Sequence, residues 1–130
     1  MADRLLLDTH AFVWWVTGSN ELSPRAIEAM HEAERVTVSL VTLWEIVLKE
    51  STKHPMVGTD DAGRWFTDAL SATGFDTIGI EASHLAAVQH LPPIHADPFD
   101  RLLVAQASAA NATLVTRDRR IPSYDVATLW

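Results

Sequence analysis

The sequence of 130 residues contains no cysteine. This absence excludes disulfide bonds, zinc sites built on thiolates and catalytic cysteine nucleophiles. No apolar run approaches the roughly 20 residues that a membrane-spanning helix needs. The opening segment MADRLLLD contains an acid and only three consecutive leucines, which does not fit a signal peptide. We therefore expect a protein of the cytoplasm that has no membrane segment.

Positive charge is also scarce. Ten lysines and arginines face 17 aspartates and glutamates, so the net charge is −7 at pH 7. A protein that binds nucleic acid through its overall field is basic, and the net charge alone therefore argues against a nucleic-acid partner. The alternative is that the carboxylates gather around metal cations, which reverse the local field. The positions of the acids along the chain decide between these two interpretations.

Short apolar runs alternate with helical patterns along the whole chain. The length and the hydrophobic content of 48% fit one globular domain over residues 1–130. Alternating strands and helices favour parallel βαβ units with right-handed crossovers. We predict an α/β fold, a three-layer α/β/α sandwich around a mainly parallel, Rossmann-like sheet of four or five strands. The predicted strands cover residues 4–7, 36–39, 75–80, 113–116 and 126–130.

The segment DPFDRLLVAQA at residues 97–107 predicts a buried helix with acids at its start. Asp97 suits the N-cap, and Pro98 suits the first helical position, where its missing N–H costs nothing. Asp100 falls in the first turn, where the helix dipole favours negative charge. Helical side chains lean toward the N-terminus, so Asp100 is expected to point past the helix start, where a ligand can bind.

Two further aspartates directly follow predicted strands. Asp8 ends the apolar run at residues 4–7, and Asp118 follows the strand at residues 113–116. Ligands of open α/β sheets bind outside the carboxyl ends of the strands, which makes both acids candidates for a binding site. Each also has a purely structural interpretation. Asp8 can cap the following helix, and Asp118 can belong to a turn.

A glutamate lies within the helix predicted over residues 40–50. By the i, i+3 and i+4 rule, Glu45 falls on one apolar stripe with Val41, Trp44 and Leu48. A carboxylate among apolar neighbours is costly unless it is paired or binds a metal. The alternative is a position at the margin of the stripe, where Glu45 reaches water or pairs with Lys49.

These acids are expected to converge at one edge of the sheet, because the carboxyl ends of parallel strands lie together. Clustered carboxylates raise each other's pKa unless a cation is present. Oxygen ligands of this kind suit Mg²⁺ or Mn²⁺. None of the six histidines has the HExxH spacing of a zinc site. We expect the histidines to serve in packing and on the surface.

Four segments carry a resemblance to a known family. LLLDTHAFVWW, SLVTLWEI, HADPFDRLLVAQA and LVTRDRRI, in this order, resemble PIN-domain proteins, and among them the VapC-like ribonuclease toxins of toxin–antitoxin pairs. The resemblance covers essentially the whole chain. It implies a PIN-like α/β/α sandwich, a divalent metal site and cleavage of RNA phosphodiester bonds. It also implies a small cognate antitoxin as partner and a homodimer.

The resemblance also assigns the acids. Asp8, Glu45, Asp100 and Asp118 match the four acidic positions of the family, in order. Asp97 is the alternate third acid, but it already has a role as the helix cap. On this basis Asp8 and Asp100 are expected to ligate Mg²⁺ or Mn²⁺ directly, while Glu45 and Asp118 complete the site or orient water.

Basic and aromatic residues near these motifs are candidates for binding. Arg117, Arg119 and Arg120 flank Asp118 and can hold the RNA backbone, or they form a solvated turn. Arg101 can pair with an acid of the site. Four tryptophans indicate either an interface or burial in one monomer: Trp14, Trp15, Trp44 and Trp65.

Two other classes of function are kept open. A PIN-like module can bind RNA or a protein without cutting it, although the presence of all four acids argues against this. A Rossmann-like phosphatase of the haloacid dehalogenase type needs a second aspartate two residues after Asp8, where this chain has His10. A receiver domain needs a late lysine, and the lysines here are Lys49 and Lys53.

Overall fold

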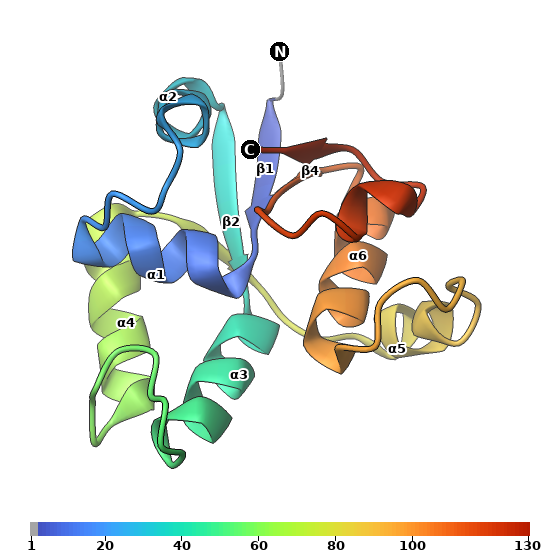
Figure 1. Cartoon of the computed structure of the whole chain (residues 1–130). Coiled ribbons are helices and arrows are strands. Elements are labelled where there is room, and N and C mark those ends of the chain that lie inside the picture. The colour runs from blue at the N-terminus through green and yellow to red at the C-terminus, as the bar shows by residue number, and fades with distance from the viewer. Residues whose placement is uncertain (1–2) are drawn as a thin grey trace.

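A five-stranded, all-parallel sheet forms the centre of the molecule (Figure 1). The computed structural model describes residues 3–130. The strand order is β3-β2-β1-β4-β5, so the N-terminal strand lies in the middle and the C-terminal strand lies at an edge. The predicted α/β architecture is confirmed. The strands are β1 (Arg4–Leu7), β2 (Arg35–Ser39), β3 (Asp76–Ile78), β4 (Thr113–Val115) and β5 (Thr128–Leu129).

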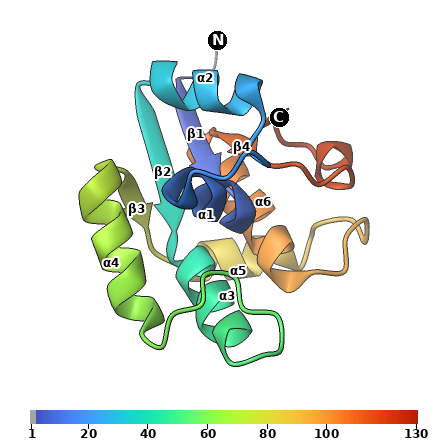
Figure 2. The same cartoon turned by 60° about the vertical axis from the view of Figure 1, so that its left-hand side comes forward.

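Helices cover both faces of the sheet (Figures 1 and 2). One core cluster joins the sheet to α1, α2 and α4, and another joins it to α3 and α6. None of the helices within residues 3–130 combines the length and the hydropathy needed to cross a membrane. The helices are α1 (Thr9–Thr17), α2 (Pro24–Glu32), α3 (Leu40–Glu50), α4 (Ala62–Thr73), α5 (Ala82–Val88) and α6 (Pro98–Ala110), with a 3₁₀ turn at Ile121–Ser123.

The leucines of β1 explain why both faces are covered. Leu5 and Leu7 belong to the core beneath α1, α2 and α4, while Leu6 belongs to the core beneath α6. Successive side chains of a strand point to opposite faces, so three consecutive leucines supply apolar surface to both layers. All three are at most 1% exposed. Such a strand is stable only in a sheet that has helices on both faces.

Polar caps start the helices that lead into the site. The Asp8 carboxylate accepts a hydrogen bond from the backbone N–H of Ala11 at 2.8 Å and begins α1. Asp97 caps α6, with Pro98 at the first helical position as predicted. At the other end of α6, Asn111 has a φ of 52°, the left-handed conformation expected of a C-terminal cap. The capping pattern of the sequence is therefore confirmed at both aspartates.

The apolar stripe predicted for α3 is wrong. Its buried residues are Val41, Thr42, Glu45 and Ile46, whereas the side chains of Trp44 and Leu48 are exposed. These four residues are spaced i, i+1, i+4 and i+5, so they lie on one face of the helix. Successive helical residues point about 100° apart, so neighbours of this face can point outward. Trp44 and Leu48 are consequently turned away from the core.

The tryptophans divide between the two interpretations of the sequence. Trp14, Trp15 and Trp65 are half-buried and pack against the core cluster beneath α1 and α4. Trp44 is exposed, and its ring lies 4.7 Å from the ring of Phe99 in an edge-to-face arrangement. Of these four tryptophans, Trp44 is therefore the exposed one, on a helix that carries other exposed apolar residues.

Candidate functional site

The acids of the four motifs line one cavity of about 290 Å³. They come from segments that are far apart in the sequence and meet at the carboxyl edge of the sheet. Asp8 follows β1, Glu45 lies in the second turn of α3, Asp100 is the third residue of α6 and Asp118 follows β4. Asp97 lines the same cavity. We call this cavity the acidic cavity.

Asp8 and Glu45 are the most buried acids of this cavity, at 7% and 6% exposure. Burial raises the pKa of the Asp8 carboxyl above its usual value, and the charge of Glu45 raises it further. Hydrogen bonds from Ala11 and Thr116, together with His10, act in the opposite direction on this pKa. Glu45 forms no ion pair with Lys49 within residues 3–130, although both line the cavity.

Asp97 and Asp100 have different roles in the first turn of α6. One Asp97 oxygen accepts hydrogen bonds from the backbone N–H groups of Phe99 at 2.8 Å and Asp100 at 3.3 Å. This geometry confirms Asp97 as the helix cap. The pKa of Asp100 is raised to about 7, first by burial and then by the charges of Asp97 and Asp8. Burial and the neighbouring acids thus both disfavour the charged form of Asp100.

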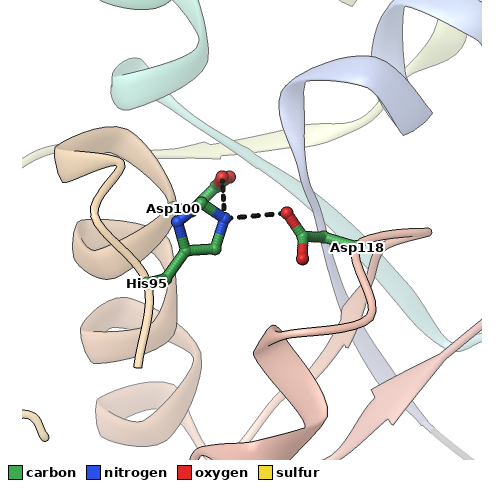
Figure 3. A group of neighbouring side chains, drawn as sticks. All are labelled: His95, Asp100 and Asp118. Atoms are coloured by element: carbon green, nitrogen blue, oxygen red, sulfur yellow. Dashed lines mark hydrogen bonds and ion pairs between the residues drawn. The ribbon is translucent and has the colours of Figure 1, made fainter. Parts of the chain in front are cut away.

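A histidine joins two of the acids (Figure 3). His95 Nε2 lies 2.7 Å from an oxygen of Asp118 and 3.1 Å from an oxygen of Asp100. Its other ring nitrogen, Nδ1, accepts the backbone N–H of Asp97 at 3.0 Å. Because Nδ1 accepts this hydrogen bond, the ring proton resides on Nε2 and is shared between the two carboxylates. His95 therefore fixes the separation of acids from α6 and from the loop after β4.

The prediction that all histidines serve in packing and on the surface is wrong for His95. This side chain is 4% exposed and lies in the acidic cavity. The absence of HExxH spacing does not bear on His95, because this residue contacts carboxylates and belongs to no zinc motif. Its position two residues before the Asp97 cap, in HADPFD, is the signal that was available in the sequence. The contact with Asp118, 23 residues away, was not.

Asp118 is held in its charged form. Burial opposes the charge, but the side chain and backbone N–H of Arg120 and the ring of His95 outweigh it and lower the pKa of Asp118 to about 2. The Arg120 backbone N–H donates to one oxygen at 2.8 Å, and its guanidinium contacts both oxygens at 3.2 and 3.3 Å. In this arrangement Arg120 neutralises an acid of the cavity.

The other arginines near the motifs occupy three different environments. Arg117 lines the acidic cavity and pairs with Glu21 at 2.6 Å. Arg119 does not line the acidic cavity and faces a neighbouring one. Arg101 was expected to be able to pair with an acid, and this is wrong. Its guanidinium donates instead to the carbonyls of Val88, Leu91 and Pro92 and to the Tyr124 hydroxyl, so it holds the loop before α6.

The donor set of the cavity fits a hard divalent cation. It consists of carboxylate oxygens from four segments, and such ligands suit Mg²⁺ or Mn²⁺. Burial is the main cause of the raised pKa values of Asp8 and Asp100, and the charges of neighbouring acids raise them further. A bound cation favours the charged form of both carboxylates. The facing side-chain atoms of His95, Asp100 and Asp118 lie within 4.8 Å of one another. Because Nε2 of His95 carries the proton, the carboxylates rather than the histidine are the available ligands.

Comparison with known proteins identifies the family. The model of the PIN domain matches residues 5–127. The chain belongs to the PIN domain family. It is 30% identical over 121 residues to the protein named ribonuclease VapC22 of Mycobacterium tuberculosis, an alignment that covers 92% of this chain and 91% of that protein. The protein is thus a VapC-like PIN nuclease homologue, and PIN nucleases are metal-dependent.

Solved structures show the same PIN fold. VapBC2 of Rickettsia felis, bound to a DNA fragment from its promoter, matches with a TM-score of 0.67 and 16% identity over 97% of both chains. A toxin–antitoxin complex from Klebsiella pneumoniae matches with a TM-score of 0.63 and 21% identity, over 97% of this chain and 96% of that chain. At these identities the similarity establishes the fold alone.

The raised pKa of Asp100 predicts a pH-dependent stability of the metal-free PIN domain. Its folded pKa of about 7 exceeds the ordinary value of 3.8, so the folded state binds this proton more tightly than the unfolded state. The resulting stabilisation is present at low pH and is lost as the pH rises through 7. Between about pH 5 and about pH 8, wild type should lose about 2 kcal/mol relative to Asp100→Asn.

Denaturant unfolding in EDTA at both pH values measures this difference. Added Mg²⁺ or Mn²⁺ should restore the stability of wild type at the higher pH, because a ligand of the folded state stabilises it. If the free energy of unfolding depended equally on pH in the two proteins, the pKa of Asp100 would not be raised in the folded state.

Proposed function

We propose that this PIN-family chain is a metal-dependent endoribonuclease and the toxin of a toxin–antitoxin pair. It hydrolyses RNA phosphodiester bonds in the cytoplasm, at a Mg²⁺ or Mn²⁺ site formed by Asp8, Glu45, Asp100 and Asp118. The observation that carries the proposal is the convergence of these four carboxylates in one cavity of a PIN fold. The similarity to a protein named as a ribonuclease supports the choice of RNA.

Asp8 and Asp100 are the proposed direct ligands. Both line the cavity, and both have raised pKa values in the absence of a compensating charge. Glu45 and Asp118 complete the site or orient the attacking water. A divalent cation bound by these carboxylates supplies a water of lowered pKa and polarises a phosphoryl oxygen.

The remaining residues of the cavity position the acids and the substrate. His95 donates Nε2–H to Asp100 and Asp118 and so holds the two carboxylates at a defined separation. Lys49 and Arg120 lie at the lining of the same cavity, where cationic side chains can contact phosphate oxygens. An acidic interior with basic residues at its lining resolves the conflict between the net charge of −7 and an RNA substrate.

The purified chain, free of any partner, is to be incubated with RNA and with single-stranded DNA of the same sequence. Each incubation contains Mg²⁺, Mn²⁺ or EDTA, and a pool of structured cellular RNAs covers the case of a narrow target. We expect RNA fragments only in the presence of metal, and intact DNA. Metal-independent cleavage would contradict the proposed site. A lack of cleavage in all samples, including the pool, would favour a non-catalytic binding module.

The partners in this proposal are a small antitoxin protein and a second copy of the chain. Several of the structural neighbours are toxin–antitoxin complexes, which supports the antitoxin.

Exposed apolar side chains on α3 support the homodimer, because a patch of this kind marks an interaction site. Light scattering of the pure chain should give twice the mass of 14.4 kDa. The exposed side chains on α3 are Leu40, Trp44, Val47 and Leu48.

A further inference from the structure

A second cavity, of about 510 Å³, adjoins the acidic cavity and shares Arg117 and Asp118 with it. Arg25 from α2, Arg117 and Arg119 all line this second cavity, which we call the basic groove. They are three of the ten basic residues of the chain. The scarce positive charge of the sequence is thus concentrated directly beside the acids.

The guanidinium groups of the basic groove are available to a ligand. Within residues 3–130, Arg25 and Arg119 form no ion pair, and Arg117 pairs only with Glu21 on the exposed surface. Exposed ion pairs are weak, so this one does not compete strongly with a phosphate. Asp118, the acid at the groove, is already neutralised by Arg120. An anionic strand therefore meets little repulsion along this surface.

Two tryptophan rings join the basic groove to the acidic cavity. Trp14 lines the acidic cavity, Trp130 lines the basic groove, and their ring centroids lie 5.9 Å apart. The guanidinium of Arg117 lies 4.5 Å from the centroid of Trp14. Figure 2 shows the C-terminal end of the chain near α2. Trp130 and Arg25 both line the basic groove. Aromatic rings and guanidinium planes are the groups on which unpaired bases stack.

We propose that the basic groove binds the unpaired RNA on one side of the cleaved phosphate. Arg25 and Arg119 contact the backbone phosphates, and Trp14 and Trp130 contact the bases. This inference rests on the proposed nuclease function and adds a direction to it, because the strand leaves the acidic cavity past Arg117. Arginine forks match phosphate oxygens, whereas bases paired in a duplex cannot reach the rings.

The charges also limit the length of this strand. A further cavity shares Arg25 with the basic groove, but Glu28 and Glu32 line it as well. The charge of the lining residues therefore changes from positive to negative beyond the first turn of α2. The RNA contact is expected to end there, so the basic groove holds a segment of only a few nucleotides.

Binding of labelled RNA to the Asp100→Asn protein tests the proposal without cleavage. Arg25→Ala and Arg119→Ala are compared singly and together. Arg64→Ala is the matched control, since Arg64 is an exposed arginine of α4 outside both cavities. Fluorescence anisotropy is recorded over a salt series, with a short unpaired RNA and with the same sequence in a duplex.

Each single variant should weaken binding of unpaired RNA about threefold to tenfold. The double variant should also lower the slope of log K against log salt by about 1.4, because each lost phosphate contact removes about 0.7. The control should bind like the parent protein. The proposal would be overturned if the double variant bound unpaired RNA as tightly as the control does. It would also be overturned if the double variant lost as much affinity for duplex RNA as for unpaired RNA. Variants that weaken only inhibition by the antitoxin would assign the groove to that protein and overturn the proposal.

The outcomes for the basic groove and for the nuclease are separable. If wild type cleaves RNA but the groove variants bind RNA like the control, the nuclease proposal stands and the basic-groove proposal fails. If the groove variants lose RNA binding but wild type cleaves no RNA, the basic groove stands as an RNA-binding surface and the nuclease proposal fails.

Discussion

Replacement of Asp100 by asparagine should abolish RNA cleavage, whereas the same replacement at Asp97 should leave most of it. Asp100 lies within the carboxylate cluster, and its pKa of about 7 reflects first its burial and then the charges of Asp97 and Asp8. An asparagine there keeps the size of the side chain but removes the charge that holds a cation. Asp97 uses its carboxylate to cap α6. Asparagine is an equally good cap, so Asp97→Asn preserves the helix start.

We expect Asp100→Asn to lose more than about a hundredfold in cleavage rate, beyond the 10–100-fold typical of residues that only support a ligand. Asp97→Asn should lose less than about tenfold, through the weaker field around Asp100. Rates are measured at saturating Mn²⁺, with Asp8→Asn as a second ligand variant. Full activity of Asp8→Asn would contradict its role as a ligand. Loss in Asp97→Asn with activity retained in Asp100→Asn would exchange the two assignments.

Replacement of His95 by alanine should weaken metal binding by about 10–100-fold, as is typical when a group that orients a ligand is removed. The Nε2–H of His95 is the donor shared by Asp100 and Asp118, at 3.1 and 2.7 Å. Without it, the two carboxylates lose the group that sets their separation. Calorimetric titration with Mn²⁺ and the metal concentration for half-maximal cleavage both measure the effect.

A purely structural role of His95 would give a different result. His95→Ala also leaves a buried gap, so a lower melting temperature by itself distinguishes nothing. Met30→Ala, a change of a buried α2 residue in the opposite core, is the control for lost packing. His95→Gln keeps an N–H donor and should recover part of the metal affinity. Unchanged metal affinity in His95→Ala would show that the histidine only packs.

Local patterns predicted the parts of the fold that depend on neighbouring residues. The Asp97-Pro98 start of α6 and the Asp8 cap follow from hydrogen bonds that span at most a few residues. The three leucines of β1 fit a strand buried on both faces, which needs helices on both sides of the sheet. The convergence of the acids followed from the parallel arrangement of the strands, since their carboxyl ends share one edge.

Helix periodicity was less informative for α3. The spacing placed Glu45, Trp44 and Leu48 on one stripe, but a stripe defines a face only to within one residue. The packing of α3 against α1, α4 and α6 selected the face that buries Glu45 and Ile46. Trp44 and Leu48 then became exposed. The rotation of a helix about its axis is decided by its neighbours.

The sequence by itself determined the order of strands and helices and the capped helix starts. It also placed Asp8 and Asp118 beyond strand ends and Glu45 and Asp100 within helices. Only the tertiary structure decided which polar groups meet the acids. The contact of His95 with Asp118 joins residues 23 apart, and the basic groove joins Arg25 to Arg119 and Trp130. Periodicity and capping act over one or two helical turns, whereas such contacts depend on the packing of whole elements, which no local pattern encodes.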